Sequence, residues 1–301
     1  MKQKKWIALT AILVLSLILT ACGSKDTSPG QTNTDTKKEE LSGKIVIGGS
    51  TALQPLAAAA AAEFMKEHPQ VQIEVQGGGS GAGLSEVSNG NFDIGMSDVF
   101  AESKSNIDAS QLKDYKVAVV GMTAAVNKDA GIKKLSKEDL IKVFTGKVKN
   151  WSEVGGKDVK ITLVNRPDGS GTRATFDEFA LDKQTPAEGI TQDSSNTVKK
   201  IVNETPGAIG YLALSYFNDD SVVKLAIDGT DATEDNVASG KFPVWAYEHM
   251  YTKGDPKPVV KAFIDYMMAD PVQSNIVPAQ GYLSVTKMQV ERDAEGKLTN
   301  K

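Results

Sequence analysis

Residues 44–96 read KIVIGGSTALQPLAAAAAAEFMKEHPQVQIEVQGGGSGAGLSEVSNGNFDIGM. Three short apolar runs, at 44–47, 71–75 and 92–96, have the length and composition of strands. Two segments typical of helices lie between them, at 55–67 and 84–88, and the first contains six consecutive alanines, which favour a helix and allow close packing. Strands that alternate with helices in this way predict an α/β fold with a mostly parallel sheet.

The alternation continues beyond this stretch. An apolar segment at 115–126 is followed by a helical pattern at 137–144 and a strand pattern at 159–164. The part of the chain that we expect to fold, 43–301, has about 260 residues, near the size at which single hydrophobic cores stop growing. We therefore expect two lobes.

Composition excludes several classes of protein. The 301 residues include 34 Lys and Arg against 38 Asp and Glu, and this balance of -4 argues against a nucleic-acid-binding protein with a broad basic face. One Cys and two His can build neither a disulfide framework nor a zinc site of the Cys/His kind, although carboxylate metal sites remain possible.

The N-terminus has the pattern of a targeting segment. Three lysines precede the uncharged stretch 6–21, which is short for a membrane-spanning helix, and Cys22 follows directly. The order Leu19-Thr20-Ala21-Cys22 resembles a bacterial lipobox, so we expect 1–21 to be a lipoprotein signal peptide and Cys22 to be acylated. The alternative is a buried free cysteine, which its position after an exported segment disfavours.

Residues 22–42 are predicted to form a disordered tether. They contain one large apolar residue and many small polar ones, so they cannot bury enough surface to fold. Removal of 1–21 also removes three lysines, which leaves 31 positive against 38 negative residues and a net charge of -7. The mature protein is expected to be acidic.

Three loops rich in Gly, Ser and Thr each follow a predicted strand and precede a predicted helix. They read GGSTA at 48–52, GGGSGAG at 77–83 and RPDGSGTR at 166–173. Helix N-termini offer unpaired N–H groups and partial positive charge, and glycine lets the backbone approach a ligand, so such loops suit a tetrahedral oxyanion. One of them alone would be an ordinary capped turn, but three in one chain favour an anion site at the carboxyl ends of the strands.

Other phosphate and catalytic motifs do not fit. No Walker A sequence occurs. GSGTRA at 169–174 matches a dinucleotide fingerprint, but three residues separate it from its strand and no second strand ends in a ribose-binding acid at the right spacing. A serine hydrolase elbow would need GxSxG, whereas 78–82 reads GGSGA, and His68 and His249 are the only histidines.

Asp98 is an unusual residue for an anion site, because carboxylates repel anions. It becomes useful if the ligand carries a proton, since an ionised carboxylate accepts a hydrogen bond from a protonated phosphate but finds no donor on sulfate. The alternative for Asp98 is a helix N-cap.

The residues resemble the PstS-like phosphate-binding lipoproteins of bacterial ABC phosphate importers, which have the type II periplasmic-binding-protein fold. The resemblance covers nearly all of 43–301. Its motifs are GGSTALQP at 48–55, QGGGSGAG at 76–83, IGMSD at 94–98, FTGKVKNWSEVGG at 144–156, RPDGSGTR at 166–173, PGAIGYL at 206–212 and FPVWAYEHMY at 242–251.

The resemblance implies a two-lobed α/β fold with a hinge and a central ligand cleft. Lobe I would comprise 43–123 plus 246–301 and lobe II 124–245, with crossovers near 122–126 and 244–247. It also implies eight phosphate contacts, four from each lobe, in which Ala52 and Gly171 use their backbone N–H groups: Thr51, Ala52, Ser80 and Asp98 from lobe I, and Arg166, Ser170, Gly171 and Thr172 from lobe II. Ala52 stands where some family members have a bulky aromatic residue.

Other residues of these motifs have structural interpretations. Phe144 and Trp151 are expected to pack in the core or at a lobe surface, and Gly207 and Gly210 to serve turn geometry. Arg173 is expected to pair with Asp177 along a helix rather than to touch the ligand.

The implied function is extracytoplasmic capture of inorganic phosphate by a protein held on the cell membrane through its lipid anchor. The partners would be permease subunits and, on the cytoplasmic side, ATPase subunits, with no catalysis, cofactor, metal or nucleic acid. One alternative keeps the fold and binds another oxyanion, such as sulfate, molybdate or a phosphate ester. A second is a membrane-anchored phosphohydrolase, for which no metal cluster is recognisable in the sequence, and a third is an adhesin or signalling receptor on the same fold.

Overall fold

A computed structural model describes residues 40–301. The predicted signal peptide 1–21, Cys22 and most of the predicted tether 22–42 lie outside the described residues. No helix within 40–301 combines the length and the apolar character that crossing a membrane requires.

The described residues form alternating strands and helices, as predicted. The strands are β1 (Gly43–Gly49), β2 (Val71–Gly78), β3 (Ile94–Ser97), β4 (Leu112–Val126), β5 (Lys134–Leu135), β6 (Thr162–Asn165), β7 (Ile190–Thr191), β8 (Ala208–Ala213), β9 (Val223–Lys224), β10 (Ala226–Ile227), β11 (Trp245–Lys253), β12 (Val290–Arg292) and β13 (Leu298–Asn300). The α-helices are α1 (Gln54–Glu67), α2 (Ser80–Asn89), α3 (Lys137–Phe144), α4 (Gly171–Phe179), α5 (Ser195–Glu204), α6 (Glu234–Ala238), α7 (Pro258–Met268) and α8 (Val277–Ala279).

The main sheet has the strand order β2-β1-β3-β11-β4-β8-β6-β7, with β9 beside β4. β1 runs parallel to β2 and β3, and β6 runs parallel to β7 and β8. β11, however, is antiparallel to both β3 and β4, and β4 is antiparallel to β8. The expectation of a mostly parallel sheet was therefore wrong, because two long strands run against their neighbours in the middle of the sheet.

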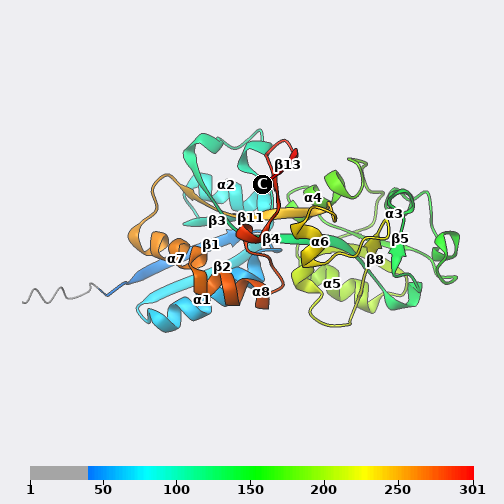
Figure 1. Cartoon of the computed structure of the whole chain (residues 1–301), viewed down its shortest axis with the longest axis horizontal. Coiled ribbons are helices and arrows are strands. Elements are labelled where there is room, and N and C mark those ends of the chain that lie inside the picture. Colours follow the sequence, from blue (N-terminus) through cyan, green and yellow to red (C-terminus); the bar gives the residue numbers. More distant parts are fainter. Residues whose placement is uncertain (1–39) are drawn as a thin grey trace, which may run out of the picture. The chain divides into compact units, whose positions relative to one another are not determined.

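Strand β4 belongs to two halves of this sheet (Figure 1). Its residues up to Gly121 pair with β11, and its residues from Met122 onward pair with β8. We call β2-β1-β3-β11 with the start of β4 the first half, and the end of β4 with β8-β6-β7 the second half. The chain returns from the second half at Val244, whose carbonyl accepts a hydrogen bond from the Met122 N–H at 2.8 Å. The chain thus passes between the two halves at 121–122 and at 244–245, and the crossovers and lobe boundaries stay predictions.

Helix α1 forms as its sequence predicts. Pro55 occupies its first turn, where the missing N–H costs no hydrogen bond. Ala57, Ala60 and Ala61 are buried together with Phe64, whose ring packs against Phe263 with centroids 5.4 Å apart. The small side chains thus let α1 approach the first half of the sheet closely.

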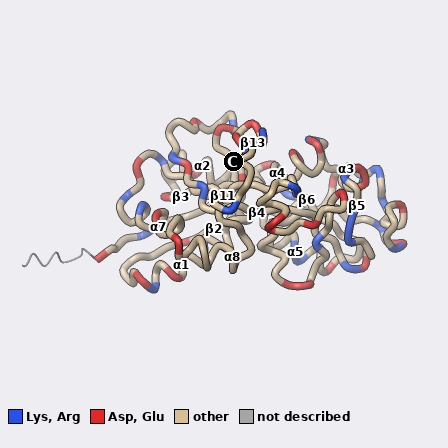
Figure 2. The backbone as a smooth tube through the Cα atoms, viewed as in Figure 1, with Lys and Arg blue, Asp and Glu red and all other residues tan. Residues whose placement is uncertain are grey.

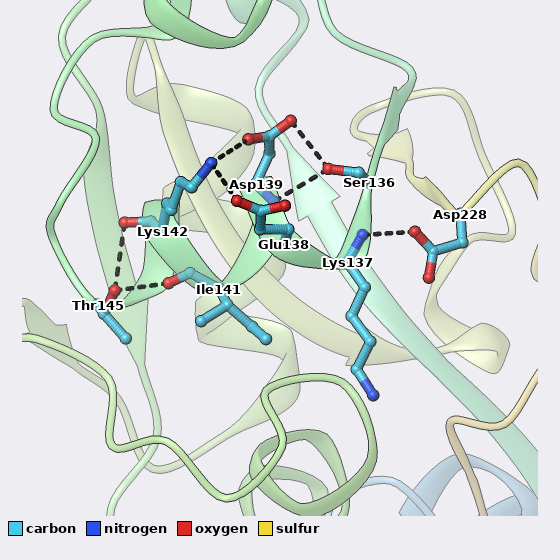
Figure 3. A network of polar contacts seen from close by, with 8 residues as sticks. All are labelled: Ser136, Lys137, Glu138, Asp139, Ile141, Lys142, Thr145 and Asp228. Carbon is cyan, nitrogen blue, oxygen red and sulfur yellow. Dashed lines mark hydrogen bonds and ion pairs between the residues drawn. The ribbon is translucent and has the colours of Figure 1, made fainter.

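Helix α3 shows how local polar contacts fix an element of the second half (Figure 3). The Ser136 hydroxyl accepts a hydrogen bond from the Asp139 N–H at 3.0 Å, which caps the helix. Lys142 pairs with Glu138 and Asp139 one turn earlier, and the Lys137 N–H donates to Asp228 at 2.7 Å. The buried helix residues Leu140, Val143 and Phe144 then face the core.

A C-terminal hairpin, β12–β13, lies against the place where the chain returns to the first half. The buried Arg292 guanidinium donates to the carbonyls of Pro243, at 2.8 Å, and Trp245. It also lies over the rings of Phe179 in α4 and Trp245 in β11, at 3.7 and 4.2 Å from their centroids. The hairpin therefore contacts elements of both halves.

Candidate functional site

The loop between β1 and α1 carries Ser50, Thr51 and Ala52, all buried. The Ser50 hydroxyl accepts hydrogen bonds from the N–H groups of Ala52 and Leu53, both at 3.0 Å, and donates to Asp98. Gly49 permits this tight turn, since a Cβ atom there would lie 2.2 Å from the Met96 carbonyl oxygen. The Ala52 N–H, expected to face the ligand, thus has Ser50 as its partner.

The loop between β2 and α2 brings Ser80 to the same place. Ser80 is the first residue of α2, and its buried hydroxyl accepts a hydrogen bond from the Asp98 N–H at 3.0 Å. The neighbouring Gly81 N–H donates to the Gly169 carbonyl at 2.9 Å. This second predicted loop therefore touches the third directly.

Asp98 follows β3 and is 4% exposed. Its carboxylate accepts hydrogen bonds from the side chains of Ser50 and, at 2.9 Å, Thr172. The pKa of Asp98 is raised, because the effect of burial exceeds that of the two hydroxyls and of the positive charge of Arg166, which lower it. The helix-cap alternative is wrong, because its carboxylate receives side-chain hydroxyls and the next helical turn is preceded by Phe100.

Arg166 follows β6 and is 1% exposed. Its Nε donates to the Gln192 carbonyl at 2.9 Å, and one Nη donates to the Asp193 carbonyl at 2.7 Å. The remaining bonds reach two hydroxyls, Thr51 and Ser195, each at 3.1 Å. Loop carbonyls therefore aim the guanidinium at the β1–α1 loop.

The start of α4 completes the site. Ser170 caps this helix by accepting from the Arg173 N–H at 3.2 Å, and Thr172 points at Asp98. Gly171 lies so close to the opposite loop that a Cβ atom there would be 2.2 Å from the Ser80 hydroxyl. Only glycine fits this position without displacing a neighbour.

Arg173 pairs with Asp177 along α4, as predicted. Its Nε pairs with Asp177 at 3.2 Å, and its Nη1 contacts Asp168 at 2.7 Å and the Arg166 carbonyl at 2.9 Å. Arg173 thus stabilises the loop 166–170 through these contacts. Phe144 and Trp151 are buried in the core, which confirms their packing interpretation.

Gly207 has a φ of +72°, the turn geometry expected for it. Gly210 instead lies in β8 against a valine side chain, since a Cβ atom there would lie 2.8 Å from Val198. Close packing, rather than a turn, explains that glycine.

All eight predicted site residues therefore converge, together with Ser50. Four residues that the sequence analysis missed contact them or lie beside them: Ser195, Tyr216, Glu248 and Tyr282. Ser195 is the first residue of α5 and follows the polar residues QDS at 192–194. Like the three loops singled out above, this segment leads from a strand to a helix, although it contains no glycine. Glu248 lies within the motif FPVWAYEHMY.

A cavity of about 300 Å³ lies beside Asp98. It is bounded by α4, the return to β11 and the C-terminal hairpin, and its walls include Phe100, Phe179, Tyr247 and Arg292. Acidic and basic residues are both scattered over the described backbone (Figure 2). Residues 40–301 contain no group of three His, Cys, Asp or Glu side chains placed to hold a metal ion.

This arrangement suits one kind of ligand. Hydroxyls, helix N-termini and one guanidinium supply donors for an oxyanion, while one carboxylate supplies an acceptor. An ion that keeps a proton can satisfy both.

The chain is similar to known proteins over most of its length. Residues 27–271 match the model of the PBP superfamily domain. The phosphate-binding protein PstS of Bacillus subtilis (strain 168) is 56% identical over 299 residues, which are 99% of this chain and 99% of that protein.

Two solved structures are similar as well. A Clostridium perfringens chain described as a phosphate ABC transporter substrate-binding protein with bound phosphate has 31% identity and a TM-score of 0.75, covering 81% of this chain and 100% of that one. An ABC-type phosphate transport receptor from Vibrio cholerae has 26% identity and a TM-score of 0.64, covering 79% and 99%.

Proposed function

Because this chain belongs to the PBP superfamily, within its family of phosphate-binding proteins, we propose that it captures inorganic phosphate and delivers it to an ABC importer. The family membership and the two-lobed α/β fold agree with the sequence-based expectation. One observation carries the proposal for the site: buried Arg166 and buried Asp98 lie among hydroxyls from three loops.

We propose that phosphate binds between the two halves of the sheet. Thr51, the Ala52 N–H, Ser80 and Asp98 would contact it from lobe I, and Arg166, Ser170, the Gly171 N–H and Thr172 from lobe II. Arg166 already donates to the Thr51 and Ser195 hydroxyls, so an entering oxyanion would exchange these for stronger charge-assisted bonds. The Ala52 N–H would likewise have to leave Ser50.

Phosphate is favoured over sulfate because of Asp98. An ionised carboxylate accepts a hydrogen bond from the O–H group of a hydrogen phosphate ion. Sulfate has no such group, so two negative groups would face each other in a buried site. This argument also disfavours molybdate, the other fully ionised oxyanion considered.

We infer that the protein performs no catalysis. Its relatives are substrate-binding transport proteins, and the arrangement explains binding without a nucleophile or a metal. Lobe I (43–123 plus 246–301) and lobe II (124–245) would move about the two crossings, and the form with bound phosphate would dock on the permease. ATP hydrolysis would take place in separate subunits.

We also propose that Cys22 carries the lipid anchor and holds the protein at the extracytoplasmic face of the cell membrane. The lipobox motif supports this, together with the net negative charge of the mature chain, which does not favour attraction to anionic lipids.

Calorimetric titration of the full-length chain in detergent with phosphate, arsenate and sulfate tests the proposed function. Phosphate should bind tightly and arsenate, which also keeps a proton, should compete with it. Sulfate should bind far more weakly, and equal affinity for phosphate and sulfate would refute the proposal.

A further inference from the structure

A second buried carboxyl group faces Asp98. β11 and β3 are antiparallel with His249 opposite Ser97, so one more step along this ladder places Glu248 opposite Asp98. Glu248 is fully buried, and Asp98 is 4% exposed. Each carboxyl group shifts the pKa of the other, which agrees with their facing each other across the two strands.

The Glu248 carboxyl group lacks a hydrogen-bond donor among the described residues. Among residues 40–301, neither of its carboxyl oxygens is paired with a donor group. On its other side β4 presents Ala118. Tyr216 and Tyr282 also face this region, but their hydroxyls donate to the carbonyls of Thr51 and Ala52.

Two carboxylates cannot both be ionised in such a place. Like charges directly opposite each other on neighbouring strands repel, and burial makes each charge costly. Asp98 has two hydroxyl donors and the nearby charge of Arg166 to stabilise its ionised form. Glu248 has none of these, so the proton belongs on Glu248.

The direction of the pKa shift agrees. Burial, and then the charge of Asp98, raise the pKa of Glu248 well above its ordinary value of 4.5. A protonated Glu248 has one O–H group to donate.

We propose that Glu248 keeps its proton and donates it in a hydrogen bond to Asp98, which makes Glu248 a positioning residue for ligand recognition. Together with Ser50, whose hydroxyl also donates to Asp98, it holds Asp98 as an oriented, ionised acceptor. Glu248 does not touch the ligand. The inference rests on the proposed function, because that function assigns Asp98 the role of accepting a hydrogen bond from the O–H group of phosphate.

Three variants separate donation from simple packing. Glu248→Gln keeps a donor of the same size, and Glu248→Met keeps the length without a donor. Thr252→Val is the control for loss of a buried hydrogen bond. Thr252 is buried in the same strand, and its hydroxyl donates to the Gly254 carbonyl rather than to Asp98.

Phosphate affinity of the full-length proteins is measured by calorimetry between pH 6 and 8. Loss of a hydrogen bond to a charged group should make Glu248→Met bind at least about tenfold more weakly than wild type, while Glu248→Gln stays within about threefold. The deficit of Glu248→Met should grow as pH falls, because Asp98 without this donor protonates more readily. Thr252→Val should match wild type. A Glu248→Met protein with normal affinity, or a Glu248→Gln protein as weak as Glu248→Met, would overturn the inference.

Infrared spectroscopy tests the proton without any ligand. The carbonyl stretch of a protonated carboxyl group should be present in wild type at pH 7 and absent from Glu248→Gln. If wild type binds no phosphate but shows this band, the proposed function fails and the protonation of Glu248 stands. If the band is missing from wild type, the inference itself is wrong.

Discussion

The Thr51 hydroxyl accepts a hydrogen bond from the Arg166 guanidinium at 3.1 Å, although 115 residues separate the two in the chain. This contact joins the loop after β1 to the loop after β6, and hence the first half of the sheet to the second. A ligand that binds both residues would connect the halves through its own oxygens.

Arg166→Ala should weaken phosphate binding at least about tenfold, because charge-assisted hydrogen bonds contribute roughly 1.5–3 kcal/mol each. Calorimetry of the folded variant measures the change. Lys142→Ala, which removes a positive charge from α3 in the same half, should bind normally. Unchanged affinity in Arg166→Ala would show that Arg166 is not a phosphate ligand.

Asp98→Asn should reduce the preference for phosphate over sulfate. The amide can donate a hydrogen bond to a fully ionised oxygen, whereas the carboxylate can only accept one. Both anions are titrated into wild type and variant at one ionic strength. If the ratio of the two affinities stays the same, Asp98 has a structural role alone.

Gly171→Ala should impair binding by forcing two loops apart. Its Cβ atom would lie 2.2 Å from the Ser80 hydroxyl and 2.9 Å from the Asp98 Cβ atom. We expect affinity to fall by an order of magnitude or more, as for overpacking that costs about 1–3 kcal/mol. Gly169→Ala, two residues earlier, is the control, since its Cβ atom would meet nothing within 4 Å. Equal affinities of the two variants would contradict this close approach.

Glu248→Gln should stabilise the protein in the absence of phosphate, and the gain should grow with pH. The raised pKa of Glu248 means that the unfolded chain loses this proton at lower pH than the folded one, so wild type loses stability as pH rises above about 4.5. The difference in the free energy of unfolding between Glu248→Gln and wild type should grow by about 1.4 kcal/mol per pH unit as long as folded Glu248 stays protonated. Urea unfolding at pH 5 and pH 8 measures it, and a gain independent of pH would argue against a protonated Glu248.

Cys22→Ser should release the protein from membranes without changing its phosphate affinity. The acyl chains would be the means of attachment, and every proposed ligand residue lies at or beyond Thr51. Fractionation after a carbonate wash follows the protein. Retention of the variant in the membrane pellet would indicate an uncleaved spanning signal.

Local features of the site could be predicted from sequence because they depend on neighbouring residues. Pro55 and the alanine run set α1, and the Gly, Ser and Thr loops identified the starts of α1, α2 and α4. The hydrogen bond from the Ala52 N–H to the Ser50 hydroxyl could not be predicted from the sequence, because it depends on the conformation of the turn.

The pairing of Asp98 with Glu248 depends on strand order and register. Their strands are adjacent only because β11 inserts between β3 and β4, against the direction of both. The alternating pattern of a strand shows which residues face inward, but not which residue of a strand 150 positions away stands opposite. Ser195 could have been identified from the sequence, since it is the first residue of a helix after a polar loop, and Ser80 likewise begins a helix after a glycine loop.

The place of β11 has a consequence for synthesis of the chain. β3 and β4 are made early, yet the strand that lies between them ends only at Lys253. Until the ribosome has passed that residue, the first half has a gap in the middle of its sheet, with two unpaired strand edges exposed. The first half of the sheet therefore cannot be completed before nearly all of the polypeptide has been translated, whereas the strands of the second half end at Ala213 and are made earlier. Folding of the two halves thus need not follow the order of synthesis.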